Sequence, residues 1–323
     1  MCYSALVWQN YRDYVRMFGA RIDIREFVRL YVDRANGAAI KTTKAMDASF
    51  ANPATDDEQQ IKALIDDWNS AQRTKLEQEM FSQKQRLSTA ERTLETKPDL
   101  KSALESKRIA ADKISRARAR LADLSRDNLV PMDSRIYPQS YLPVMVSEAG
   151  ERVIKPMRYL CRLPNAPALM DKKLQGNYNS RFDNLKNFWR PLFGVTHGVV
   201  VVTRFYENVS QHRLEKRELA QGEQERNVVL EFRPEPEQTM LIACLWSHWK
   251  GRAGEPDLLS CSMITNDPLP EVAAAGHDRT IIDIKPENLD RWLNPDREDS
   301  DAQIAILLDR QPPYYAHNLE QAA

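Results

Sequence analysis

The sequence has few cysteines, and their placement argues against the sites that cysteines most often build. Cys2, Cys161, Cys244 and Cys261 are widely separated, with no C-x-x-C motif and no accompanying pair of histidines. Structural zinc sites need closely spaced ligands, and the disulfide frameworks of small secreted domains need regularly spaced cysteines. We therefore expect no metal site. Isolated thiols of this kind are typical of proteins from a reducing compartment.

Net charge and long apolar runs are also absent. The 46 basic and 46 acidic side chains cancel, so no global field draws the chain towards nucleic acid or anionic lipid. Any DNA binding must then come from a local patch. Arg12, Asp13 and Arg16 interrupt the stretch where a signal peptide needs apolar residues, and no other segment is apolar enough to span a membrane. We expect a soluble, cytoplasmic protein that does not bind membranes.

The short signatures of several large enzyme classes are missing as well. The sequence contains no GxGxxG, no GxxxxGKS or GxxxxGKT, no HExxH and no GxSxG, and it has no internal repeat. These absences argue against the usual dinucleotide, P-loop, zinc-protease and serine-hydrolase sites. We expect no cofactor.

Glycine is absent between residues 55 and 126, a polar segment with a single proline, Pro98. The sequence "TDDE" at 55–58 is typical of a helix-capping box, and Pro98 is well placed for the first turn of a second helix. Apolar residues recur at helical spacing on both sides of it. The pattern predicts an antiparallel αα-hairpin over residues 37–128. Its apolar residues are Ile61, Leu64, Ile65, Trp68, Leu76, Met80, Leu87 and Leu94, then Leu100, Leu104, Ile114, Leu121 and Leu124.

The second arm of this hairpin holds a basic stretch, "KRIAADKISRARAR" at residues 107–120, in which Asp112 is the only acid. Such a stretch could bind phosphate groups. It could also be a solvated helix surface opposite a packed apolar stripe, which is the more common arrangement and the one we favour.

The remaining residues, 1–36 and 129–323, have the features of a globular core domain. Ile24, Phe27 and Tyr31 are spaced as one face of an amphipathic helix. After residue 129 the short apolar runs "YLPVMVS", "HGVVVVTRFYE", "QTMLIACLW", "LLSCSMIT" and "RTIIDI" indicate strands. Because helices do not regularly separate them, we predict an α+β fold with a mixed or antiparallel sheet and flanking helices, rather than a doubly wound sheet.

Removal of the initiator methionine would place Cys2 at the start of the chain, where a cysteine has chemistry that no internal cysteine has. Its amine and thiol titrate near ~8 and ~8.5, so both have unprotonated fractions at neutral pH. The pair can condense with an aldehyde and close a five-membered thiazolidine ring, or the amine can act as a local base for the thiol. The alternative is a small second residue with no chemical role.

Three further polar residues lie next to strand-like runs. Asn179 stands in "GNYNSRFDNL", Glu207 follows "VVVVTRFY", and His277 lies in "AAAGHDRTIIDI". Each has a structural explanation when taken singly: a turn for the asparagine, a solvated strand end for the glutamate, and a hydrogen-bonded structural role for the histidine. Together with a terminal cysteine they form a candidate catalytic group.

In these segments the chain resembles the SOS response-associated peptidase (SRAP) family, whose members crosslink to abasic sites in DNA. The start "MC" matches the family's cysteine after the initiator methionine. "RIYPQSYLPVMV", "PMRYLCRLP" and "NSRFD" are similar to its "RYN-AP-Q-PV", "MRWGLIP" and "NARSE". "TRFYEN", "IACLW", "SMIT" and "GHDRT" are similar to "DGFYEW", "AGLW", "TIIT" and "HDRMP". The matches keep their order over residues 1–35 and 130–293, and the hairpin is interpreted as an insertion.

The resemblance implies covalent capture of abasic sites in single-stranded or junction DNA, in the DNA damage response. Cys2 matches the nucleophile, whose amine forms the first imine with the sugar aldehyde. Asn179 matches the residue that positions this terminus and the sugar. Glu207 matches the glutamate that moves protons as the deoxyribose ring opens, and His277 matches the acid/base histidine. The basic positions that line the family's DNA groove are matched by Arg158, Arg181 and Arg279.

Several positions depart from the family pattern. The four reactive positions are kept while the nucleic-acid surface is altered, so the resemblance supports the crosslinking chemistry better than DNA affinity or strand preference. The departures are Tyr3-Ser4 in place of Gly-Arg, Tyr159 in place of Trp, Asp183 in place of Glu, and Thr280-Ile281 in place of Met-Pro.

Two other functions stay open. Cys2 could attack an amide, with His277 as the base and Asn179 stabilising an oxyanion, as in a cysteine peptidase or a self-processing enzyme. The chain could also be a non-enzymatic interaction protein with a degenerate site, which binds a protein partner through the hairpin. Of the three functions, only crosslinking predicts a denaturation-resistant adduct with abasic DNA.

Overall fold

Two compact units make up the chain in a computed structural model, which describes residues 3–251, 255–310 and 312–320. The core unit comprises Met1–Asn52 and Val130–Ala323, and the hairpin unit comprises Pro53–Leu129. The predicted start of the hairpin at residue 37 is therefore too early. Residues 37–52 fold with the core unit because Phe50 is fully buried there, with its ring 5.3 Å from that of Tyr11 and 5.6 Å from that of Phe27.

The strands of the described ranges form one mixed sheet, which confirms the predicted α+β class. Most neighbouring strands are antiparallel, but β10 is parallel to β5 and β6, and β2 is parallel to β5. The run "RTIIDI", predicted as a full strand, contributes only the short β11. The strands are β1 (Ser4–Val7), β2 (Arg21–Ile22), β3 (Arg135–Ile136), β4 (Tyr141–Glu148), β5 (Glu151–Tyr159), β6 (Asn179–Arg181), β7 (His197–Ser210), β8 (Asn227–Glu235), β9 (Met240–Trp249), β10 (Leu258–Asn266), β11 (Thr280–Ile281) and β12 (Tyr314–Leu319).

Part of this sheet closes on itself. β4 pairs with β5 and β7, β5 pairs with β10, β10 with β9, and β9 with β7. The ring is a small barrel, and buried valines at alternating positions of β4 and β7, such as Val144 and Val200, help to fill its core. Gly198 lets β4 and β9 approach β7, because a Cβ there would lie 3.0 Å from Val144 Cγ1 and from Cys244 Sγ.

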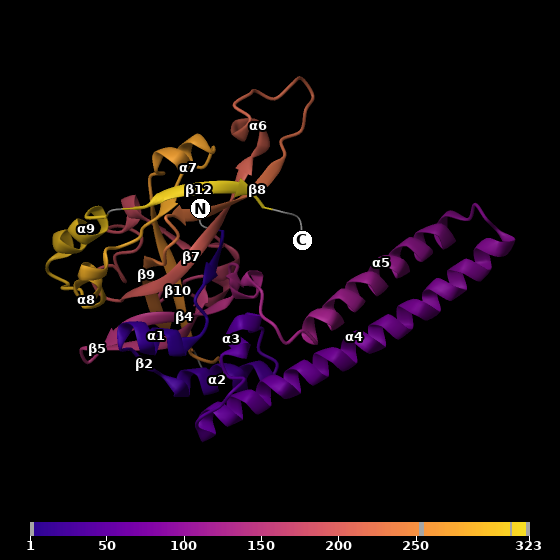
Figure 1. Cartoon of the computed structure of the whole chain (residues 1–323), viewed down its shortest axis with the longest axis horizontal. Coiled ribbons are helices and arrows are strands. Elements are labelled where there is room, and N and C mark those ends of the chain that lie inside the picture. The colour runs from indigo at the N-terminus through magenta and orange to yellow at the C-terminus, as the bar shows by residue number, and fades with distance from the viewer. Residues whose placement is uncertain (1–2, 252–254, 311, 321–323) are drawn as a thin grey trace. The chain divides into compact units, whose positions relative to one another are not determined.

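The two halves of strand β7 pair with different strands, and this pairing positions the site. Its first half pairs with β9, while its second half pairs with β8 and β1. Glu207 therefore lies beyond the barrel, opposite Leu230 of β8. Figure 1 shows β8, β12 and α7 (Pro270–Ala274) gathered around this part of β7.

The helices of the core unit are short and lie between strands. The predicted amphipathic helix around Phe27 is confirmed as α2, which buries Phe27, Leu30 and Tyr31. Among the described residues, every helix is either too short or too polar to span a bilayer. Besides α7, the core helices are α1 (Tyr11–Phe18), α2 (Ile24–Ala35), α3 (Lys44–Ala48), α6 (Gln211–Leu214), α8 (Leu289–Leu293) and α9 (Ser300–Leu308).

The hairpin unit consists of two antiparallel helices, α4 (Asp56–Thr96) and α5 (Lys101–Leu124), that run side by side (Figure 1). The cap at the start of α4 forms as predicted, with Thr55 Oγ1 accepting from the backbone N–H of Glu58. Pro98 lies in the connection between the helices, so its predicted place in the first turn of α5 is wrong.

The seam of the hairpin uses smaller residues than the leucine pattern predicted. Ala103, Ala110 and Ala117, spaced by seven, are buried along α5, and alanines at heptad spacing let two helix backbones approach closely. Leu104, by contrast, is 47% exposed and so is not part of the buried seam. Half of the basic stretch is paired with acids inside the unit: Lys107 with Glu91, Arg108 with Glu105, and Arg116 with Asp112.

Candidate active site

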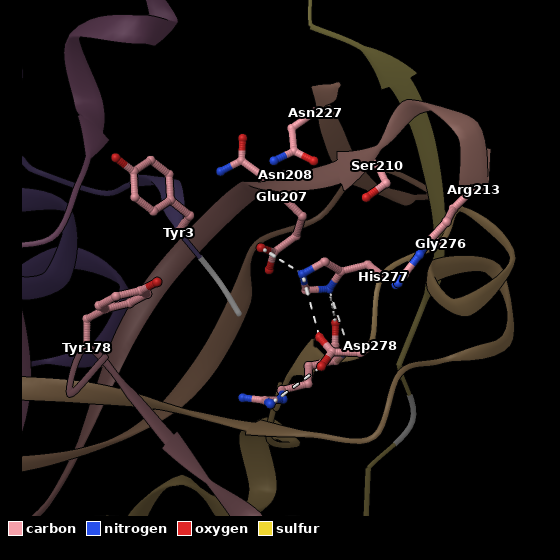
Figure 2. A pocket seen from close by; sticks show the side chains of 11 residues that line it. Tyr3, Tyr178, Glu207, Asn208, Ser210, Arg213, Asn227, Gly276, His277 and Asp278 are labelled. Atoms are coloured by element: carbon pink, nitrogen blue, oxygen red, sulfur yellow. Dashed lines mark hydrogen bonds and ion pairs between the residues drawn. The ribbon is translucent and has the colours of Figure 1, made fainter. Parts of the chain in front are cut away.

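A pocket of about 340 Å³ opens beside the second half of β7 (Figure 2). Its walls come from distant parts of the sequence: the residue before β1, the residue before β6, the end of β7 with α6, the start of β8, and the loop between α7 and β11. Tyr3 and Tyr178 stand on one side, and His277 and Arg213 stand on the other. The pairing of β7 with β1 and β8 brings these segments together, so the pocket exists only in the folded chain.

Glu207 projects from β7 into this pocket, and its side chain is only 1% exposed. Burial disfavours the charged carboxylate and raises the pKa of Glu207 to about 8, although a hydrogen bond from the backbone N–H of Tyr3 acts in the opposite direction. The nearby Asp278 carboxylate adds to the increase in pKa. At neutral pH this carboxyl group is largely protonated, and a carboxyl group with a pKa near neutrality is suited to both giving and taking a proton.

His277 reaches the same carboxyl group from the loop between α7 and β11, and its Nε2 lies 3.3 Å from Glu207 Oε2. The preceding Gly276 has a φ of +90°, which favours glycine. A Cβ at that position would lie 3.0 Å from Val209 Cγ1 and 3.1 Å from Arg213 Cβ. Glycine therefore allows the loop to approach β7 and α6 closely enough for His277 to contact Glu207.

The protonation of this pair follows from its hydrogen bonds and its burial. His277 Nδ1–H donates to the backbone carbonyl of Arg279 at 2.9 Å, which orients the ring and leaves Nε2 as the acceptor nitrogen facing Glu207. Burial lowers the pKa of His277 to about 4. At neutral pH the two side chains are thus mainly an uncharged acid beside an uncharged imidazole, rather than an ion pair.

Asn179, the third predicted residue, begins β6 opposite Met263 of β10. Its side chain is buried, and neither its amide oxygen nor its amide nitrogen has a hydrogen-bond partner in the described ranges. Buried amides are normally paired, so this one is a donor and an acceptor available for a ligand. The pocket wall itself includes the adjacent Tyr178 rather than Asn179.

Cys2, the fourth predicted residue, lies outside the described residues. Tyr3, which follows it, lines the pocket and donates its backbone N–H to Glu207. The other cysteines, Cys161, Cys244 and Cys261, are buried and free, and burial raises the pKa of Cys161 to about 12. Within the described ranges no group of His, Cys, Asp or Glu side chains is arranged to hold a metal ion.

Two of the three predicted DNA-contacting arginines lie near the pocket. Arg279 lines it and has a guanidinium nitrogen 3.4 Å from Asp278. Arg181 ends β6, is exposed, and pairs with Asp183 at 2.6 Å. The hydrogen bond with Asp183 raises the pKa of Arg181, and the Asp278 carboxylate adds to this increase. The hydrogen bond with Arg181 lowers the pKa of Asp183, and the Arg279 guanidinium adds to this decrease, so these side chains are electrostatic neighbours.

Arg158 is placed differently, because protein groups hold its guanidinium. It donates to Asp171 at 2.8 Å and to the backbone carbonyl of Leu160 at 3.0 Å, and its side chain is 14% exposed. The pocket wall, as far as the described residues form it, does not include Arg158. This geometry favours a structural role.

Sequence reasoning missed several residues that line the pocket. In the sequence Tyr3 stands out only as a departure from the family pattern, and Tyr178 and Asn208 adjoin two of the predicted site residues. No sequence signal marks Arg213 or Asn227, which come from α6 and from the first residue of β8.

One family model matches this chain. The family model described as SOS response associated peptidase matches residues 99–321, which is more than half of the chain and begins just before α5. A search of curated proteins found no match.

Solved structures also resemble this chain. One is a protein from Bordetella bronchiseptica, with 17% identity, a TM-score of 0.47, and coverage of 58% of this chain and 88% of that one. A second is a protein from Bacteroides thetaiotaomicron, with 15% identity, a TM-score of 0.47, and coverage of 58% and 77%. A third is a phage-related protein from Bordetella bronchiseptica, with 14% identity, a TM-score of 0.43, and coverage of 58% and 81%.

Proposed function

The chain belongs to the SOS response-associated peptidase family, and we propose that it captures abasic sites in single-stranded DNA as a covalent adduct. In this proposal Met1 is removed, and the amine and thiol of Cys2 close a thiazolidine ring on C1′ of the abasic sugar. Family membership associates the protein with the SOS response to DNA damage. The abasic substrate, the adduct and its mechanism are the parts that we propose.

The observation that supports this most is the uncharged Glu207–His277 pair beside the backbone of Tyr3. The two side chains are buried, and Nε2 of His277 lies 3.3 Å from Oε2 of Glu207. The Glu207 carboxyl group also accepts a hydrogen bond from the backbone N–H of Tyr3, the residue that follows Cys2. A nucleophile at the start of the chain would thus work next to a proton donor and a proton acceptor.

Such a pair suits the first chemical step. An abasic sugar is mainly a closed hemiacetal, so its C1′ hydroxyl must lose a proton and O4′ must gain one before the C1′–O4′ bond breaks to give the aldehyde. We propose that the acid form of Glu207 donates the proton to O4′. Nε2 of His277 accepts the proton that the C1′ hydroxyl loses. Transfer of that proton from His277 back to Glu207 resets the pair.

Condensation with Cys2 follows. The Cys2 amine adds to C1′, and the resulting carbinolamine loses water to form an imine. The thiol then adds its sulfur to C1′ and its proton to the nitrogen, which closes the ring. One aldehyde and one aminothiol give one thiazolidine and one water, with no oxidant or reductant.

The remaining polar groups bind the substrate in this proposal. The buried amide of Asn179, which has no partner among the described residues, binds the amino terminus or the sugar. Arg279 and Arg181 contact DNA phosphates next to the abasic site, since both lie near the pocket. The natural partner is single-stranded or junction DNA with an abasic site.

A cysteine peptidase, including one that processes its own N-terminus, is the second candidate because the matched family is described as a peptidase. It would use Cys2 and His277 but would leave no stable product on DNA. The test is incubation with an abasic single-stranded oligonucleotide, followed by heating in denaturant and electrophoresis. We expect an adduct with the mass of protein plus DNA minus one water, and its absence from a sample that begins at Cys2 would overturn the proposal.

A further inference from the structure

Tyr3 places an aromatic ring at the wall of the pocket, in a position where the family pattern has glycine. The residue is 41% exposed, although it is large and apolar. Its ring meets Tyr137 at 5.9 Å with an interplanar angle of 71°, and Tyr178 at 6.4 Å with an angle of 79°. Both contacts are edge-to-face, the arrangement that aromatic pairs prefer.

These contacts hold the Tyr3 ring without covering it. Tyr178 is only 7% exposed and packs in turn against Tyr159 at 5.6 Å, so it is a fixed support. Because Tyr3 and Tyr178 meet at a steep angle, they cannot clamp a flat ligand between them. A supported ring with an exposed surface beside a polar pocket is the arrangement that stacks one base of a single strand.

The opposite side of the pocket supplies the complementary charge. Arg213 lies there beside His277, and Arg279 and the acid Asp278 also line the pocket. In the described ranges the Arg213 side chain has no hydrogen bond or ion pair. A polar, cationic side facing an aromatic side matches a nucleotide, which has a phosphate at one end and a base at the other.

We propose that Tyr3 is a specificity-determining residue, on which the base next to the abasic sugar stacks. The inference rests on the proposed function, since it assumes that the sugar lies beside Glu207 and His277. It adds that this protein binds an abasic site with an intact neighbouring base, and that a purine, which has the larger flat surface, binds better than a pyrimidine.

Binding can be measured apart from crosslinking by fluorescence anisotropy with short oligonucleotides that contain tetrahydrofuran, an abasic analogue that has no aldehyde. The neighbour on the 5′ or the 3′ side is adenine, cytosine or a second tetrahydrofuran. We expect wild-type protein to bind about 5- to 100-fold more weakly when the base on one side is removed, with adenine better than cytosine.

The variants separate stacking from a structural role. Tyr3→Gly keeps the backbone N–H that contacts Glu207, and it should bind all the oligonucleotides weakly and equally. Tyr3→Phe should keep the discrimination, and Tyr314→Ala, which removes an exposed tyrosine outside the pocket wall, should behave as wild type.

Equal binding by the wild type whether or not either neighbour is present would overturn the inference, as would unchanged discrimination by Tyr3→Gly. The proposed function is tested separately by the adduct on aldehyde-bearing DNA. At saturating DNA, Tyr3→Gly should still form that adduct.

Discussion

The Nε2 atom of His277 lies 3.3 Å from the Oε2 atom of Glu207, although the two residues come from a loop and a strand that are far apart in the sequence. The same burial moves their pKa values in opposite directions, to about 8 for Glu207 and about 4 for His277. Both groups are therefore mainly uncharged at neutral pH, and the acid holds the proton while the imidazole can accept one. General acid–base catalysis requires an acid and a base whose pKa values differ in this way.

The rate of adduct formation should depend on pH through two groups. It should rise towards pH ~8 as the amine of Cys2 loses its proton, and fall above about pH 8 as Glu207 loses the proton that it gives to O4′. Glu207→Gln should slow the reaction by about 100-fold or more and remove the falling limb. Single-turnover rates between pH 5 and 10 check this, and a falling limb that persists in Glu207→Gln would assign it to another group.

The same pKa shift predicts a cost in stability. Glu207 has its ordinary pKa of 4.5 in the unfolded chain and a pKa of about 8 in the folded one. Between these values the unfolded chain releases a proton that the folded chain keeps, so stability falls as pH rises through this window and is unaffected by this group below it. Glu207→Gln should raise the free energy of unfolding of the core unit by about 1–3 kcal/mol near pH 8.

Urea unfolding at pH 5 and pH 8 measures that difference. The gain should be small at pH 5, and Glu77→Gln, an exposed glutamate in the hairpin unit, should show no such dependence. A gain for Glu207→Gln that is equal at the two pH values would contradict a buried, protonated carboxyl group.

Cys2→Ser should abolish the heat-stable adduct, because an oxygen nucleophile would close a labile oxazolidine in place of the thiazolidine. A preparation that keeps Met1 should be equally inert, since its cysteine has no free amine. Denaturing electrophoresis and intact mass measure both results. Undiminished heat-stable product from Cys2→Ser would refute the thiazolidine.

Replacing residues 53–129 with a short glycine–serine linker should leave the core unit folded and reactive. These residues form their own compact unit with a seam between α4 and α5. We expect adduct formation on a short abasic oligonucleotide to persist with the same salt dependence, since acids already pair with Lys107, Arg108 and Arg116.

We propose that the hairpin unit binds a protein partner rather than DNA. Such a partner would bind the full chain but not the variant that lacks residues 53–129. Loss of reaction on the shortest substrate, with the core unit still folded, would show that the hairpin unit helps to build the active site. A flatter salt dependence on long DNA would show that its basic residues contact phosphates.

Arg279→Gln should weaken DNA binding, whereas Arg158→Gln should lower the stability of the fold. Arg279 lines the pocket, so its loss should weaken binding to all abasic oligonucleotides and reduce the salt slope by about 1, with little change in melting temperature. Arg158 pairs with Asp171, so its loss should destabilise the fold by about 1–3 kcal/mol and leave affinity largely intact. Anisotropy titrations at several salt concentrations and thermal melts check both, and a reversed pattern would exchange the two roles.

Much of the architecture could be predicted because its signals are local. The strands β4, β7, β9 and β10 follow from short apolar runs, and the hairpin helices follow from helical spacing and the cap at Thr55. The seam of the hairpin could not be predicted in the same way. Whether Leu104 or Ala103 faces α4 depends on how closely two backbones approach, which is a property of the pair and not of either helix.

The candidate site likewise has a part that local motifs predict and a part that only the fold determines. Asn179, Glu207 and His277 could be named from short motifs, since each motif lies within a few residues of chain. The contact between Glu207 and His277, and the burial that moves their pKa values, come from the pairing of β7 with β1 and β8 and from the close approach that Gly276 allows. Tyr3 and Arg213 line the pocket because the fold brings distant segments together. Arg158 is not part of the wall that the described residues form, since its guanidinium is bound to Asp171. Burial and electrostatics depend on these distances in space, which spacing along the chain does not encode.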